Sequence, residues 1–151
     1  MLTWEQCRAD FDADGSLRDI FVLDTTIDQW RSVYVMLSTN YSCSFEVDGV
    51  PRVLPLLVDE MFAIRRAESK PILTIRAGNV TVACHFFSEK EIELSLDPAE
   101  VTSQVELDPL LAFLKQIGDL CKKPITVHRE NYKKFPLITY DADKKEFRRA
   151  E

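Results

Sequence analysis

The first clear pattern along the chain is an alternation of hydrophobic and polar residues around a short turn. Residues 42–47 (SCSFEV) alternate strictly, and Asp48-Gly49 separates them from residues 50–54 (VPRVL). Such a two-residue turn joins the strands of a β-hairpin. Pro51 has no amide hydrogen to donate, so we expect the second strand to lie at a sheet edge.

The same pattern returns in the middle of the chain. Residues 72–77 (ILTIRA) and 80–87 (VTVACHFF) flank Gly78-Asn79, and residues 91–96 (EIELSL) continue the alternation. We expect a second hairpin here, extended by a third strand into a meander.

The register of this meander decides which side chains can meet. If Ala77 lies opposite Val80, Cys84 belongs to the buried face. The same register places His85 opposite Glu93 on the other face. Because adjacent strand residues point to opposite sides, Cys84 and His85 cannot act together as a nucleophile and base.

Two longer segments have hydrophobic residues at helical spacing. In residues 25–40 they form one stripe, and Thr25 with Asp28 predicts a capping box at its start. A second stripe in residues 108–123 follows Asp108-Pro109, which suits a helix start, and precedes Pro124, which suits its end. Asp97-Pro98 predicts a brief helical segment, and residues 3–11 and 57–68 predict two short helices.

Three further hydrophobic runs predict strands, at residues 19–24 (DIFVLD), 125–129 (ITVHR) and 136–141 (PLITYD). The charged residues 141–151 are expected to form a tail that frays. Together these elements predict an α+β fold in one domain spanning residues 1–151. Its antiparallel sheet of two or three hairpins would pack on two main helices in two layers.

The charges are distributed unevenly. The net charge is −6, and residues 85–119 carry 8 acids against 2 bases, whereas residues 120–151 carry 5 acids against 9 bases. An acidic body argues against nucleic-acid binding and favours a basic protein partner.

Composition also indicates a compartment. The start of the chain has no basic segment followed by an apolar stretch, and no apolar run of 18 residues is present, so we expect a soluble cytoplasmic protein without a membrane partner. The four cysteines have no C-x-x-C spacing, which predicts reduced thiols and no zinc framework.

No motif for catalysis or cofactor binding is found. With four glycines the chain contains no G-x-G-x-x-G, no Walker A loop and no G-x-S-x-G. Glu91 and Glu93 share one strand face and could form a metal or acid–base pair, but alternation alone explains them. We therefore expect no catalytic residue, no metal and no cofactor.

The loop at residues 130–135 (ENYKKF) interleaves aromatic and basic residues. Single-strand nucleic-acid binders use such a pattern, but an acidic body repels phosphate. Tyr132 and Phe135 are therefore candidates for a protein interface, or for closing the end of the core beneath the loop.

Residues 10–20 (DFDADGSLRDI) resemble the start of a calcium-binding loop. Asp10, Asp12 and Asp14 occupy its first, third and fifth places, but the twelfth place, which needs a carboxylate, is Phe21. We expect a turn into the first strand that does not bind calcium, with its acids adding to the acidic surface.

In its acidic segments DFDADGSLRDI and EKEIELSLDPAE, and in its lack of a catalytic motif, the chain resembles the small acidic α+β immunity proteins of bacterial toxin systems. The resemblance implies a cytosolic, non-enzymatic protein that binds one partner. Acidic surface would speed and direct association with a basic partner.

The leading hypothesis is therefore a protein-binding module, an immunity or inhibitor protein whose acidic surface meets a basic protein. Its candidate contact residues are Asp12, Asp14, Glu91, Glu93, Tyr132 and Phe135. One alternative is a small enzyme or ligand-binding domain that uses His85 and Glu93 on an open sheet face. Another is a subunit of a larger assembly, joined through the edge near Pro51 or the Tyr132 loop.

Overall fold

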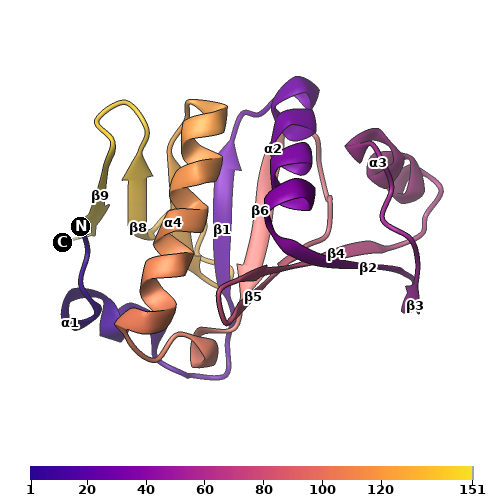
Figure 1. Cartoon of the computed structure of the whole chain (residues 1–151). Helices are drawn as coiled ribbons and strands as arrows, with labels where there is room; N and C mark the ends of the chain where they lie inside the picture. Colours follow the sequence, from indigo (N-terminus) through magenta and orange to yellow (C-terminus); the bar gives the residue numbers. More distant parts are fainter. Residues whose placement is uncertain (151) are drawn as a thin grey trace.

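The computed structural model describes residues 1–150 and has a mixed α+β fold around one antiparallel sheet (Figure 1). The strand order is β3-β2-β4-β5-β6-β1-β7-β8-β9. The strands are β1 (Arg18–Leu23), β2 (Ser42–Val47), β3 (Val50–Pro51), β4 (Pro71–Ala77), β5 (Val80–Cys84), β6 (Glu91–Leu96), β7 (Ile125–Arg129), β8 (Pro136–Asp141) and β9 (Glu146–Arg149). The helices are α1 (Trp4–Cys7), α2 (Ile27–Asn40), α3 (Val58–Arg66) and α4 (Gln104–Cys121), with 3-10 turns η1 (Arg8–Phe11) and η2 (Pro98–Glu100).

The sheet is larger than the two or three hairpins expected. Both predicted turns have the expected register, with Val47 opposite Val50 and Ala77 opposite Val80. The short strand that carries Pro51 is an edge, as predicted. The larger size comes from β1, which pairs with both β6 and β7. It joins the strands β2–β6 to the strands β7–β9 in one sheet of nine strands.

Two helix starts differ from the sequence prediction. α2 is capped by Thr26, whose side chain accepts a hydrogen bond from the Gln29 amide, rather than by Thr25. α4 begins at Gln104 with Ser103 as its cap, so Pro109 lies inside the helix instead of at its start. A neighbouring turn approaches this proline closely: a Cβ on Gly78 would lie 2.8 Å from Pro109 Cβ, and Gly78 also has a φ of 63°.

The two faces of the sheet differ in what covers them. Figure 1 shows α2 and α4 in front of the sheet, and α4 contacts β4, β7 and β8. The strand residues facing these helices are buried in the core, among them Ile20, Cys84 and Leu94, so the prediction that Cys84 is a core residue is confirmed. The alternate residues, from Ser44 on β2 to Thr139 on β8, line the opposite face, which we call the open face.

The charged C-terminal segment is a strand, not a frayed tail. Residues 146–149 form β9, which pairs with β8, and Phe147 lies opposite Tyr140. Arg149 donates from Nε and Nη2 to the buried carboxylate of Asp10 at 2.6 and 2.9 Å. Such a pair, which links residues 139 positions apart, leaves no local signal in the sequence.

None of the described helices combines the length and the apolar character needed to cross a bilayer.

Candidate functional site

An acidic row runs across the centre of the open face. It consists of Asp19 on β1 and Glu91 and Glu93 on β6. In the ladder between these strands Phe21 lies opposite Glu93, and Asp19 lies opposite Ser95. Asp19 and Glu93 are therefore diagonal neighbours on one face, close enough for their charges to interact.

The protonation of this row reflects burial and repulsion. Burial raises the pKa of Glu93 above its ordinary value, and the charges of Asp19 and Glu91 raise it further. Burial also raises the pKa of Asp19, although the Asn131 amide, which donates to its carboxylate, opposes the shift. Within residues 1–150 neither Asp19 nor Glu93 forms an ion pair. Of the three carboxylates of the row, that of Glu91 is paired with Lys133, whose charge also partly opposes the shift at Glu93. Asp19 and Glu93 have no ion-pair partner of their own in this part of the chain.

The loop at residues 130–135 folds back along the row and contacts both of its ends, Asp19 through the Asn131 amide and Glu91 through Lys133. Lys133 Nζ lies 2.5 Å from Glu91 Oε2 and 4.8 Å from the centroid of the Phe21 ring. His128, which is buried, has its Nδ1 3.0 Å from the carbonyl oxygen of Tyr132. One lysine of the chain itself is thus held on the open face by an ion pair and a cation–π contact.

Large hydrophobic side chains flank the row. Tyr132 and Phe135 are 57% and 68% exposed, so they do not close the core beneath their loop. Leu17 and Leu23, at the two ends of β1, are also exposed. Exposed aromatic and aliphatic groups around a polar centre supply contact area for a protein partner.

The predicted pairing of His85 with Glu93 is not formed. The β5–β6 ladder has the expected register, but it ends at Cys84 and Leu94. Beyond that point the backbone turns away at Phe86, which has a positive φ of 54°, and the His85 ring stacks on Phe87 at 5.2 Å. A shallow pocket of about 350 Å³ beside His85 is lined by Ser95 but not by Glu93. The enzyme hypothesis thus lacks the pair on which it depended.

The loop at residues 10–17 is organised around an internal cation. Arg18 is fully buried and its guanidinium donates to three backbone carbonyls, those of Asp10, Asp12 and Leu17, at 2.7 to 3.1 Å. It also contacts the Asp14 carboxylate at 3.4 Å, and hydrogen bonds from Ser16 and Arg18 hold the pKa of Asp14 well below its usual range. Of the three carboxylates that a calcium-loop reading would assign to an ion, Arg18 contacts that of Asp14, whereas that of Asp10 is bound to Arg149. Asp12 remains exposed at the surface.

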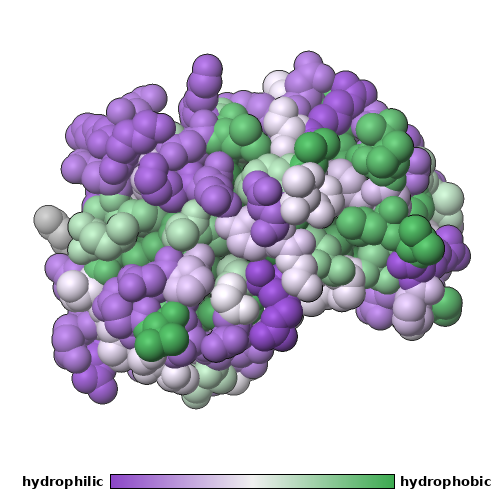
Figure 2. Space-filling model, in the orientation of Figure 1, coloured by the Kyte–Doolittle hydropathy of each residue, from purple (hydrophilic) through white to green (hydrophobic). Residues whose placement is uncertain are grey.

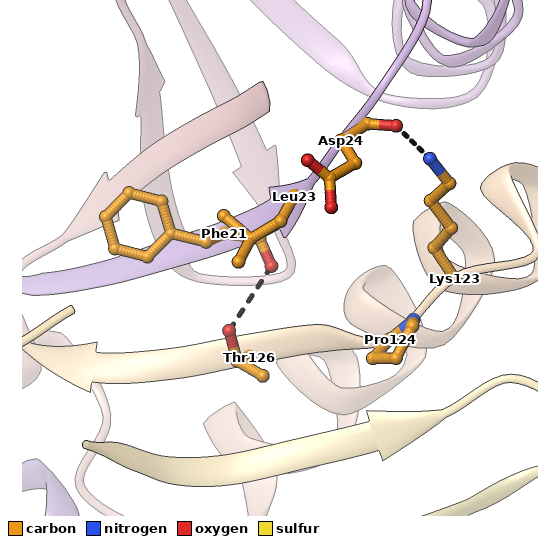
Figure 3. Close-up of a pocket in the computed structure, with 6 residues that line it drawn as sticks. All are labelled: Phe21, Leu23, Asp24, Lys123, Pro124 and Thr126. Atoms are coloured by element: carbon orange, nitrogen blue, oxygen red, sulfur yellow. Dashed lines mark hydrogen bonds between the residues drawn. The ribbon is translucent and has the colours of Figure 1, made fainter. Parts of the chain in front are cut away.

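A pocket of about 380 Å³ lies on the open face where β1 and β7 separate (Figure 3). Its lining residues are Phe21, Leu23, Asp24, Lys123, Pro124 and Thr126. The β1–β7 ladder ends at Phe21 and Thr126, whose hydroxyl donates to the Phe21 carbonyl at 3.4 Å. The Lys123 ammonium donates to the carbonyl oxygen of Asp24.

An exposed hydrophobic segment that the sequence analysis missed follows the edge strand β3. Val50, Val53, Leu56 and Leu57 all have exposed side chains, and Val53 and Leu56 are 93% and 85% exposed. We call these four residues the edge patch. Figure 2 shows hydrophobic residues gathered at the end of the molecule where β3 and α3 lie. The signal available in the sequence was the run VPRVLPLL, whose two prolines prevent the regular structure that would bury it.

Within residues 1–150 no group of three His, Cys, Asp or Glu side chains is placed to hold a metal ion. Comparison with protein-family models, with curated proteins and with solved structures finds no match to this chain.

Proposed function

We propose that the chain is a non-enzymatic protein-binding module and that the open face receives a basic protein. The observation that carries the proposal is the acidic row, in which Asp19 and Glu93 have raised pKa values and no ion-pair partner in the described chain. A lysine or arginine placed beside them would relieve their repulsion. The repulsion between these carboxylates in the free protein would be relieved in the complex, which favours binding.

The surroundings of the row supply the other requirement of an interface. Tyr132, Phe135, Leu17 and Leu23 give hydrophobic area at its borders, where partner side chains can exclude water from the charge pairs. The same acidic surface disfavours nucleic acid, since phosphates would meet uncompensated carboxylates. An immunity or inhibitor protein is the class of function that this arrangement suits best.

The test is capture of partners by the immobilised chain from a lysate of the source organism, followed by mass spectrometry and repeated at several salt concentrations. Glu93→Lys should abolish recovery of a stoichiometric basic partner. Glu60→Lys, the same charge reversal at an exposed position on α3, should leave recovery unchanged. Binding to the native protein should weaken as salt rises. The proposal fails if no stoichiometric partner is recovered, or if the two variants behave alike.

A second candidate function rests on the edge patch, because four exposed aliphatic side chains beside an edge strand favour a contact with another subunit. In this reading the chain is a subunit of a larger assembly. Leu56→Asp should then release the chain from its native complex in sedimentation experiments, whereas Glu93→Lys should not. A strictly monomeric protein among its native components would contradict it.

A further inference from the structure

The pocket between β1 and β7 combines hydrophobic walls with one carboxylate that no cation neutralises. Phe21, Leu23 and Pro124 form the walls, and the methylene chain of Lys123 passes along one side (Figure 3). Asp24 follows directly after β1 and has a positive φ of 56°, so its side chain leaves the alternation of the strand. Among residues 1–150 Asp24 forms no ion pair.

The lysine that lines the pocket is turned elsewhere. The ammonium of Lys123 is bound to the backbone carbonyl of Asp24, and Figure 3 shows the Asp24 carboxylate directed away from that ammonium. The pocket therefore offers a carboxylate as an acceptor, with Thr126 Oγ1 nearby, while Lys123 contributes chiefly its hydrophobic stem.

A long side chain with an apolar stem and a cationic head matches this combination. Arginine fits it better than lysine, because its planar guanidinium can pair with a carboxylate through two parallel hydrogen bonds and loses less hydration on entering a half-closed site. An aliphatic side chain would fill the walls but leave Asp24 unpaired, and an anion would be repelled by Asp24 and by the adjoining acidic row.

We infer that the pocket lined by Leu23, Asp24 and Pro124 binds one arginine side chain of the basic partner, with the guanidinium paired to Asp24. The inference rests on the proposed function of the open face and names the residue that anchors the partner there. It adds a specific contact to a row of charges that otherwise selects only for positive charge.

The experiment titrates the ¹⁵N-labelled chain with N-acetyl-arginine amide and follows backbone amide shifts. Saturable shifts should concentrate at Leu23, Asp24, Lys123 and Thr126. N-acetyl-citrulline amide, which has the same shape without the charge, and N-acetyl-leucine amide should bind more weakly, with lysine amide in between. Asp24→Asn should weaken arginine-amide binding about two- to fivefold, the range of a partly exposed ion pair, whereas Asp143→Asn should have no effect.

The inference is overturned if citrulline or leucine amide binds as well as arginine amide, if Asp24→Asn binds unchanged, or if the shifts lie elsewhere. Glu93→Gln separates this result from the wider proposal. It should leave arginine-amide binding at the pocket intact while weakening capture of the protein partner. If the pocket does not bind arginine but the open face is the interface, Glu93→Gln still weakens capture of the protein partner. If the open face is not the interface, Glu93→Gln does not change that capture.

Discussion

Replacing Arg18 by methionine removes the guanidinium around which residues 10–17 fold and keeps an unbranched apolar side chain in its place. The wild-type side chain is fully buried and donates to the carbonyl oxygens of Asp10, Asp12 and Leu17 at 2.7, 3.0 and 3.1 Å. In Arg18→Met these three acceptors lose a charged donor.

The expected loss follows from the surroundings of each acceptor. Asp10 is buried, so its carbonyl would remain unpaired at a cost of about 1–3 kcal/mol. Asp12 and Leu17 are at the surface, and water can replace most of what their carbonyls lose. We expect the free energy of unfolding to fall by about 3 kcal/mol, which lowers the Tm of a chain of this size by about 6–12 °C.

The assay is urea unfolding followed by tryptophan fluorescence, because Trp4 stacks on Phe11 beside the loop, and by circular dichroism. Urea is used because guanidinium itself could occupy the vacated site. Indeed, low millimolar methylguanidinium should raise the Tm of Arg18→Ala and leave the wild type unchanged. The matched control is Arg148→Met, whose exposed guanidinium pairs with Asp141 at 3.3 Å and with no other described carboxylate, and which should change stability by less than about 0.5 kcal/mol.

Equal stabilities of Arg18→Met and Arg148→Met would refute the reasoning. So would a saturable rise in the Tm of the wild type with millimolar Ca²⁺. Since the Asp10 carboxylate is already bound to Arg149 and the Asp14 carboxylate contacts Arg18, Ca²⁺ should leave the Tm unchanged.

Three further predictions concern other contacts. Arg149→Met should cost about 3 kcal/mol in urea unfolding, because the carboxylate of Asp10 stays buried without its cation; a loss below about 1 kcal/mol would show that β9 is held by strand pairing alone. Gly118→Ala should cost about 1–3 kcal/mol although alanine favours helices, since its Cβ would lie 2.8 Å from the ring of Tyr140; a higher Tm would contradict this close packing of α4 on β8. Burial and neighbouring acids raise the pKa of Glu93 in the folded state, so the charged carboxylate destabilises the fold and stability falls as pH rises through that pKa. Glu93→Gln should therefore be more stable than wild type at pH 7, by less than about 1 kcal/mol. This gain should vanish in urea titrations below about pH 4. A gain that persists at low pH would mean that packing, not charge, causes it.

The hairpins were predictable because their signals are local. Asp48-Gly49 and Gly78-Asn79 set the turns, and strict alternation then set which residues are buried, including Cys84. The helix starts were less certain, since several capping residues stand close together and only packing selects among them. Thr25, for example, donates from its hydroxyl to the carbonyl of Glu89, which leaves Thr26 to cap α2.

The candidate site was predictable only in part. Glu91 and Glu93 were expected on one strand face. Tyr132 and Phe135 were expected either at a protein interface or closing the end of the core, and their exposure excludes the second. Asp19 was not connected with them, because it joins the row only through the pairing of β1 with β6, and Asp19 and Glu93 are 74 positions apart in the sequence. The edge patch was missed because neither a helical nor an alternating pattern describes an irregular exposed segment.

The sequence by itself determined the local elements: where the chain alternates, where it turns, where it forms amphipathic helices and where its acids gather. The tertiary structure alone decided that β1 sits between β6 and β7, that Arg149 of the charged end pairs with Asp10, and that a guanidinium fills the loop that resembles a calcium site. It also decided where β1 and β7 part to leave a pocket. The physical reason is that periodicity and turn preference act over a few residues, whereas strand order, buried ion pairs and cavities depend on contacts between residues up to 139 positions apart.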